Sequence, residues 1–489
     1  MSEKDLSGKE EASGGKARPY PAKRNTIWIN RATSVVRLEV LIFLLLWFAY
    51  GMAVNSDNQF RFNLPHVSVE AMVERHQLYL EGSSLPELQP WGDVFLYHGH
   101  KYAAKQPGEA MAGAIAYSAL RAAGLRYSEN YYLTSALVTF LTTSLVLAAS
   151  AVGVFGIARN LTRDAQSLFW PMLTTFAYAL ATTVFAYSGI AHHDALATGY
   201  LVLAFYFIFQ ISRHTRPFGR GTMLMSVAAG FLLGLTVTTS MLPFFMVLVC
   251  AIYFLSLRQG KLIPFFLAAM LIGLLPLFIY DFQSFGNPFL LSNVVSADQF
   301  PDTFFRFGAN NLAGKLVFYS SMLVVYVPSV AIGLFGLSYY PRALKRTPVF
   351  ITLVALLVVL MVYVLNIDTL GHCQFGPRYL LPAMPFACLG IIGYTYLSTE
   401  NERWLAGIIV VLVSIVSFVI NLVGAVQGAM CCPDGRNALR NQLTLLVRGD
   451  VHHFPLAPWL FAPLLICTAL LAWKVWQGQN TRPHRTRKT

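Results

Sequence analysis

The most regular feature of this sequence is the recurrence of long apolar segments that are separated by short polar ones. A helix that crosses the hydrocarbon core of a bilayer needs about 20 apolar residues, and segments near this length recur from Arg37 onward. They predict about twelve spans, at residues 38–54, 131–157, 167–188, 194–212, 222–239, 241–257, 262–280, 315–339, 348–366, 378–397, 404–424 and 456–473. We therefore expect an all-α polytopic membrane protein.

Composition and charge agree with this prediction and orient the chain. Of the 489 residues, 56% are hydrophobic and 12% are charged, whereas soluble domains carry about a quarter charged residues. Lys and Arg accumulate in both terminal regions and in the predicted turns near Arg213 and Arg342. Such residues stay in the cytoplasm, so we expect an inner-membrane protein with both termini cytoplasmic. The net charge of +13 then follows from topology, and no nucleic-acid partner is expected.

The predicted organisation has three parts. Residues 1–30 form a polar cytoplasmic tail that is expected to be disordered. Residues 31–475 form the transmembrane domain, with outer loop 55–130, and residues 476–489 form a basic cytoplasmic tail. A cleaved signal peptide is not expected, because the first apolar run begins far from the N-terminus.

The six cysteines fall into two groups. Those inside predicted spans are expected to be small apolar fillers: Cys250, Cys388 and Cys467. The others fall on the predicted outer face, where disulfides can persist. Either Cys373 pairs with Cys431 or Cys432, or all three remain unpaired thiols.

Ionisable residues of the spans gather at their predicted outer ends: Asp194, Asp281, Asp368 and Arg378. A protein that moves ions through a bilayer usually places such groups along its helices. The distribution favours an enzyme with its site at the outer interface. A transporter or flippase of a lipid-linked substrate is the alternative.

The first outer loop is the segment richest in candidate chemistry. Residues 67–80 have Val69, Met72, Val73 and Leu80 at helical spacing, which predicts an interfacial helix. Lys105 precedes a Pro-Gly turn and a predicted helix over 109–122, whose free N–H groups would favour an anion such as phosphate.

Four short motifs resemble bacterial membrane glycosyltransferases of the GT-C superfamily, and in particular the branch related to protein O-mannosyltransferases and the lipid A aminoarabinose transferase. They are Asn-Ser-Asp-Asn-Gln-Phe-Arg at 55–61, Tyr-His-Gly-His-Lys-Tyr-Ala-Ala-Lys-Gln-Pro-Gly at 97–108, Phe-Gly-Asn-Pro-Phe at 285–289 and Phe-Gly-Pro-Arg-Tyr-Leu-Leu-Pro at 375–382. The resemblance implies a hexosyl- or pentosyltransferase that uses a polyprenyl-phosphate sugar donor in the membrane. Its acceptor would be a glycan, glycolipid or protein. Asp57 would be the base of an inverting reaction.

In this chemistry two cations hold the departing phosphate while a carboxylate takes the acceptor proton. Lys105 and Arg378 are the candidates for the phosphate, and further pocket candidates are Asp93, Tyr102, His193, Asp194 and Tyr379. Ala104 stands where related loops often carry Asp, so neither a metal nor another cofactor is expected. Each assignment has a simpler alternative: Asp57 as a helix cap, Lys105 as an interfacial lysine and Arg378 as an interfacial anchor.

Overall fold

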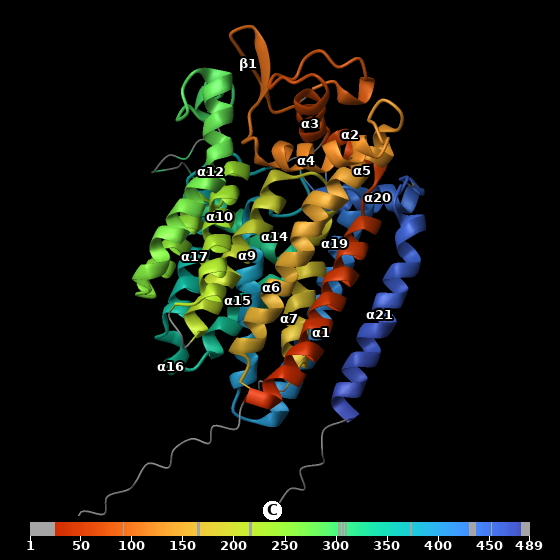
Figure 1. The fold of residues 1–489 in the computed structure, drawn as a ribbon. Helices are drawn as coiled ribbons and strands as arrows, with labels where there is room; N and C mark the ends of the chain where they lie inside the picture. The colour runs from red at the N-terminus through yellow and green to blue at the C-terminus, as the bar shows by residue number, and fades with distance from the viewer. Residues whose placement is uncertain are drawn as a thin grey trace, which may run out of the picture.

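The computed structural model describes residues 25–480, except for 91, 164–166, 215–217, 302–304, 306–307, 309–310, 372–373, 430–436 and 451, and it describes only the backbone of 25–37 and 477–480. Long helices form a bundle, and a smaller layer built from residues 55–130 covers one end of it (Figure 1). We call this layer the first-loop subdomain. Cys373, Cys431, Cys432 and most of both predicted tails lie outside the described residues.

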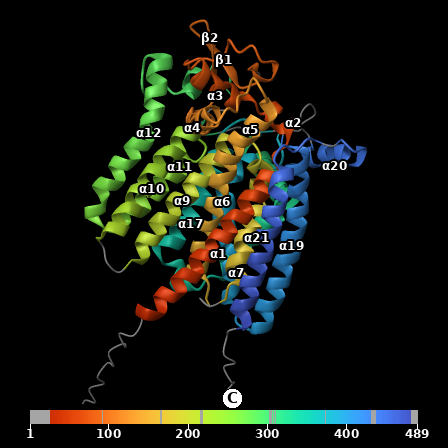
Figure 2. The same cartoon turned by 45° about the vertical axis from the view of Figure 1, so that its right-hand side comes forward.

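The bundle contains helices from every predicted apolar segment. They are α1 (Asn25–Met52), α5 (Tyr131–Thr139), η2 (Phe140–Ser144), α6 (Leu145–Leu161), α7 (Phe169–Leu180), α8 (Thr183–Ser188), α9 (His193–Arg213), α10 (Arg220–Thr239), α11 (Phe244–Ser256), η3 (Gly260–Leu262), α12 (Ile263–Phe285), α14 (Leu312–Tyr326), α15 (Pro328–Gly336), η5 (Leu337–Tyr339), α17 (Pro348–Leu365), η6 (Arg378–Ala383), α18 (Met384–Cys388), η7 (Leu389–Tyr396), α19 (Glu400–Gln427) and α21 (Ala457–Asn480). Short helices join them: α13 (Ser292–Val295), α16 (Arg342–Lys345) and α20 (Ala438–Arg448). Helix α20 projects sideways at the end that bears the first-loop subdomain (Figure 2).

Eight helical stretches of the described chain are long and apolar enough to cross a membrane, and the bent pair formed by α14 and the helix from Pro328 to Tyr339 adds a ninth. The bend of 106° falls at Pro328, which lacks the N–H needed to continue α14. Segment 167–188 is divided into α7 and α8 by Thr182, which caps the second helix. The fold is therefore that of a multi-pass membrane protein.

Helices α10 and α12 pack with their backbones in contact. An added Cβ at Gly230 or Gly234 would overlap a carbonyl oxygen of α12, and one at Gly273 would overlap the Phe231 carbonyl oxygen of α10. Small residues spaced four apart permit this close approach in membranes. Elsewhere in the core, Cys250, Cys388 and Cys467 are buried free thiols, which confirms that they act as apolar fillers.

The first-loop subdomain contains α2 (Ser56–Arg61), α3 (Leu64–Glu74), η1 (Pro86–Leu88), a hairpin of β1 (Val94–Tyr97) and β2 (His100–Ala103), and α4 (Gly108–Ala122). Helix α3 corresponds to the helix predicted at 67–80, but it ends at Glu74, and His76 takes a positive φ of 55° that does not continue a helix. Val67 and Val69 of α3 are buried against Tyr117 of α4. The apolar side of α3 therefore packs against α4 within this layer.

Candidate active site

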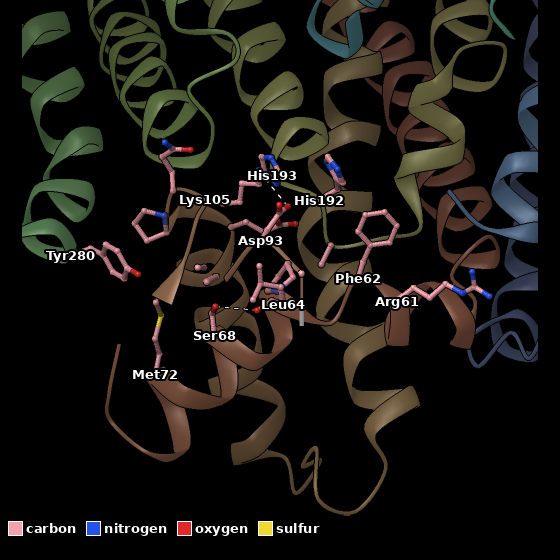
Figure 3. Close-up of a pocket in the computed structure, with 18 of the residues that line it drawn as sticks. Arg61, Phe62, Leu64, Ser68, Met72, Asp93, Lys105, His192, His193 and Tyr280 are labelled. Atoms are coloured by element: carbon pink, nitrogen blue, oxygen red, sulfur yellow. Dashed lines mark hydrogen bonds and ion pairs between the residues drawn. The ribbon is translucent and has the colours of Figure 1, made fainter. Parts of the chain in front are cut away.

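A cavity of about 120 Å³ lies where the first-loop subdomain meets the bundle (Figure 3). Its walls come from segments that are far apart in the sequence, namely α2, α3, the hairpin, the start of α4, the start of α9, α12 and the segment that leads into η6. The polar and charged side chains that line it are Arg61, Ser68, Asp93, Lys105, Gln106, Glu109, His192, His193, Tyr280, Gln374 and Arg378.

The hairpin brings Asp93 and Lys105 together. Strands β1 and β2 are antiparallel, and the turn residues His98 and Gly99 both have positive φ, 47° and 88°, as a tight two-residue turn requires. At the open end of the hairpin, the Ala104 N–H donates to the Asp93 carbonyl oxygen at 2.7 Å. Lys105 Nζ then lies 3.4 Å from Asp93 Oδ2, and Figure 3 shows this pair beside His193.

The start of α9 fixes a second carboxylate. His192 caps the helix, since its Nδ1 accepts a hydrogen bond from the Asp194 N–H at 3.3 Å. Asp194 is buried, and its Oδ1 accepts a hydrogen bond from Ser240 Oγ at 2.7 Å. His193 Nε2 lies 3.4 Å from the same oxygen. Burial, reinforced by the neighbouring His193, holds the pKa of His192 well below its ordinary value, so this ring is neutral at physiological pH.

Arg378 is buried and only partly paired. Its guanidinium stacks on the Tyr379 ring, 4.4 Å from the ring centroid, and its Nη2 donates to the Tyr379 hydroxyl at 2.6 Å. Its Nε lies 3.8 Å from Asp194 Oδ2, which is beyond hydrogen-bond distance. Neither of these two atoms has a hydrogen-bond partner among the described residues. A buried N–H without a partner is costly, so Arg378 has a donor available for a bound anion.

Lys105 and Arg378 face the same space and both act on Asp93. Burial raises the pKa of Asp93, but Lys105, Arg378 and His193 together outweigh burial, and the pKa ends below its ordinary value. Lys105 and Arg378 also line a smaller adjoining cavity of about 50 Å³ together with Tyr379. Two fixed cations that face one space form a suitable site for a phosphate group.

Glu109 is a site residue that the sequence did not reveal. Its place in the first turn of α4 is explained by the helix dipole alone. The structure buries it to 5% exposure, and Oε1 has no hydrogen-bond partner in the described chain. Burial, with a smaller contribution from Asp194, raises the pKa of Glu109 well above its ordinary value, so the cavity wall contains an acid that favours its neutral form.

Asp57 is not among the described residues that line the cavity. It lies on α2, where Arg61 Nε donates to its Oδ1 at 2.9 Å, and Arg61 is itself a wall residue. In Figure 3 Arg61 lies well apart from the Lys105–Asp93 pair. The side chain of Asp57 keeps 23% of its surface exposed, so it is accessible from outside the cavity.

Tyr102 and Tyr379 have different surroundings. Tyr102 is buried in a cluster with Phe95 and Phe285, with ring centroids 6.0 and 5.4 Å away, and it is absent from the described lining of the main cavity. Tyr379 supports Arg378, as described above. No group of three or more His, Cys, Asp or Glu side chains that could hold a metal ion occurs in the part of the chain that the structure describes.

No protein-family model matches this chain, and no curated protein does. Solved structures with a similar fold include ArnT from Cupriavidus metallidurans bound to undecaprenyl phosphate, which is 16% identical with a TM-score of 0.49 over 91% of this chain and 78% of that one. The apo state of the same protein gives 16% identity and a TM-score of 0.48 over 92% and 76%.

Another similar structure is the archaeal oligosaccharyltransferase AglB from Archaeoglobus fulgidus in complex with an inhibitory peptide and a dolichol-phosphate. It is 11% identical with a TM-score of 0.45, over 82% of this chain and 57% of that one. ArnT and AglB are both members of the GT-C superfamily. At these identities and TM-scores the likenesses assign no activity or substrate to this chain.

Proposed function

We propose that this chain is a glycosyltransferase that moves a sugar from a polyprenyl-phosphate-linked donor to an acceptor, at the membrane face that bears the first-loop subdomain. The observation that supports this most directly is the convergence of Lys105 and Arg378 on one cavity. The sequence motifs that resemble GT-C glycosyltransferases point to the same chemistry.

The depth of the cavity suits a lipid-linked phosphate. Arg378 and His193 are each the first residue of a helical stretch that could span the membrane, so the cavity lies level with helix ends, where lipid headgroups are expected. A phosphate held there by Lys105 and Arg378 would leave its hydrocarbon tail beside the bundle. A soluble nucleotide-linked donor would have no need of such a position.

The reaction is a displacement at the anomeric carbon of the sugar. The acceptor hydroxyl oxygen forms the new bond to this carbon, while the bond to the phosphate oxygen breaks and its electron pair leaves with the polyprenyl phosphate. A carboxylate takes the hydroxyl proton, and the two cations stabilise the negative charge that develops on the phosphate. Attack from the side opposite the phosphate inverts the anomeric configuration.

We assign different roles to the two candidate carboxylates, Asp57 and Asp93. Asp93 lies 3.4 Å from Lys105 Nζ, on the phosphate side, so it suits positioning of Lys105. Asp57 is paired with Arg61 rather than with Lys105 or Arg378, and it is accessible from outside the cavity. We therefore propose Asp57 as the base.

The test is transfer of radiolabelled sugar from undecaprenyl-phosphate-linked donors by the purified protein, with Asp57→Asn and Asp93→Asn as matched variants. We expect Asp57→Asn to lower turnover about 100-fold or more, with undecaprenyl phosphate binding unchanged. Asp93→Asn should mainly weaken donor affinity. Normal turnover in Asp57→Asn with an inactive Asp93→Asn would give the base role to Asp93. Translocation of labelled donor across vesicles without transfer would favour a flippase instead.

A further inference from the structure

A second cavity opens at the opposite end of the bundle, between the end of α6, the start of α7 and the first turns of α19. Helices α7 and α19 contact each other. The cavity has a volume of about 870 Å³, and its walls include Arg163, Trp170, Arg403, Trp404 and Leu412. We call it the Arg163–Arg403 groove.

Two cations meet at the mouth of this groove. Arg403 Nη1 donates to the Leu397 carbonyl oxygen at 2.7 Å, and Arg163 Nη1 approaches the same oxygen at 3.5 Å. Within the described chain, which omits 164–166, neither arginine takes part in an ion pair. Glu400 is the carboxylate that the described wall contributes. The described wall therefore carries an excess of positive charge, and its two guanidinium groups are held close together.

The groove runs from headgroup depth into the hydrocarbon. Helix α19 has 28 residues, so at about 1.5 Å per residue it is about 42 Å long, whereas the hydrocarbon core is about 30 Å thick. The first turn contains Glu400, Glu402 and Arg403, and charged residues are costly in hydrocarbon. This turn is therefore the end that extends beyond the core, while Ile408 and Leu412 lie within it. Trp404 is 71% exposed between them, as an aromatic residue at a membrane boundary commonly is.

We propose that the Arg163–Arg403 groove binds one glycerophospholipid with an anionic headgroup. The two arginines hold the phosphate, and the acyl chains lie along the apolar side of α19 at Ile408, Val411 and Leu412. A zwitterionic lipid would bring its own cation to a wall that already has an excess of positive charge, so the charge balance selects an anionic one. This site is separate from the proposed active site and does not depend on the proposed function.

The test measures lipid retained by the full-length protein after exchange into phosphatidylglycerol and phosphatidylcholine mixtures, by native mass spectrometry. We expect preferential retention of one phosphatidylglycerol. Each arginine near an anionic lipid contributes about fivefold in affinity, so Arg163→Gln combined with Arg403→Gln should lower the affinity for phosphatidylglycerol about 25-fold. The control combines Arg342→Gln with Arg346→Gln, two exposed arginines of another turn, and should retain phosphatidylglycerol as the wild type does.

A second variant keeps the test decisive if loss of Arg403 harms folding. Leu412 is a wall residue that keeps 57% of its surface exposed, so Leu412→Trp fills the groove without disturbing the core. We expect it to lose the retained phosphatidylglycerol while all the arginines remain. Wild-type retention in Leu412→Trp, equal retention of both lipids by the wild type, or equal losses in the control and the Arg163/Arg403 double variant would each overturn the proposal.

Discussion

Replacement of Lys105 by Gln tests the phosphate site with little damage to the fold. The side chain of Lys105 keeps 21% of its surface exposed, and that of its partner Asp93 keeps 48%. Ion pairs this open to solvent contribute about 0–1 kcal/mol to stability. The variant should therefore fold normally, and a change in ligand affinity would report on the site itself.

The expected loss of affinity is much larger than this structural cost. Removing one partner of a desolvated charge pair costs about 2–5 kcal/mol, which corresponds to about 30-fold or more in a dissociation constant. Because Lys105 is partly exposed and Arg378 remains in place, we expect the lower end of that range, about 30- to 100-fold.

The assay is direct binding of radiolabelled undecaprenyl phosphate to the purified protein. Lys101→Gln is the matched control, since Lys101 belongs to the same hairpin and is exposed. It removes the same charge from the chain without touching the cavity. If Lys105→Gln binds undecaprenyl phosphate as tightly as the wild type, or if Lys101→Gln weakens binding equally, the proposed phosphate site is wrong.

Three further predictions address the buried acid, the helix packing and the topology. The pKa of Glu109 is raised from an ordinary 4.5, so the folded protein keeps a proton that the unfolded chain loses, and stability falls as pH rises above about 4.5. Glu109→Gln should flatten this fall in melting temperature between pH 5 and 8. An unchanged slope would contradict the role of buried Glu109. Gly230→Ala should lower the free energy of unfolding by about 1–3 kcal/mol through overlap with α12, seen as a lower melting temperature. Gly221→Ala, in open space on the same helix, should leave the melting temperature unchanged. Equal effects would refute the packing argument. In a background without native cysteines, an impermeant thiol reagent added to intact cells should label His98→Cys and leave Arg346→Cys unlabelled; the reverse pattern would invert the topology.

The sequence by itself determined where the membrane helices are. A polar backbone can cross hydrocarbon only with its hydrogen bonds satisfied internally, so each long apolar segment had to be helical, and each of the twelve segments contains a helix. The Asp93–Lys105 pair also depends mainly on local sequence. The His98-Gly99 turn closes the hairpin and so brings its two ends together. Pairing between strands so near in sequence needs little help from the rest of the fold.

Tertiary packing decided the shape of the bundle and the environment of the site. Pro328 interrupts the helix, but the size of the resulting bend, 106°, depends on the helices packed around it. Likewise, nothing in the order of residues around Glu109 distinguishes an exposed helix-start acid from one buried in a cavity wall. Burial is set by which distant segments cover a residue, and here the start of α9 and the segment before η6 complete the cavity.

Asp57 shows the same division most clearly. Its place directly after the first apolar segment fixes its depth at the end of a helix, and this much could be predicted from sequence. Its pairing with Arg61 is a local i,i+4 contact along α2. Its separation from Lys105 could not be predicted, because it depends on how α2 turns against the bundle. Local sequence thus determined helices, turns and depth through the backbone's need for hydrogen bonds, whereas long-range packing alone decided which charged groups share a cavity.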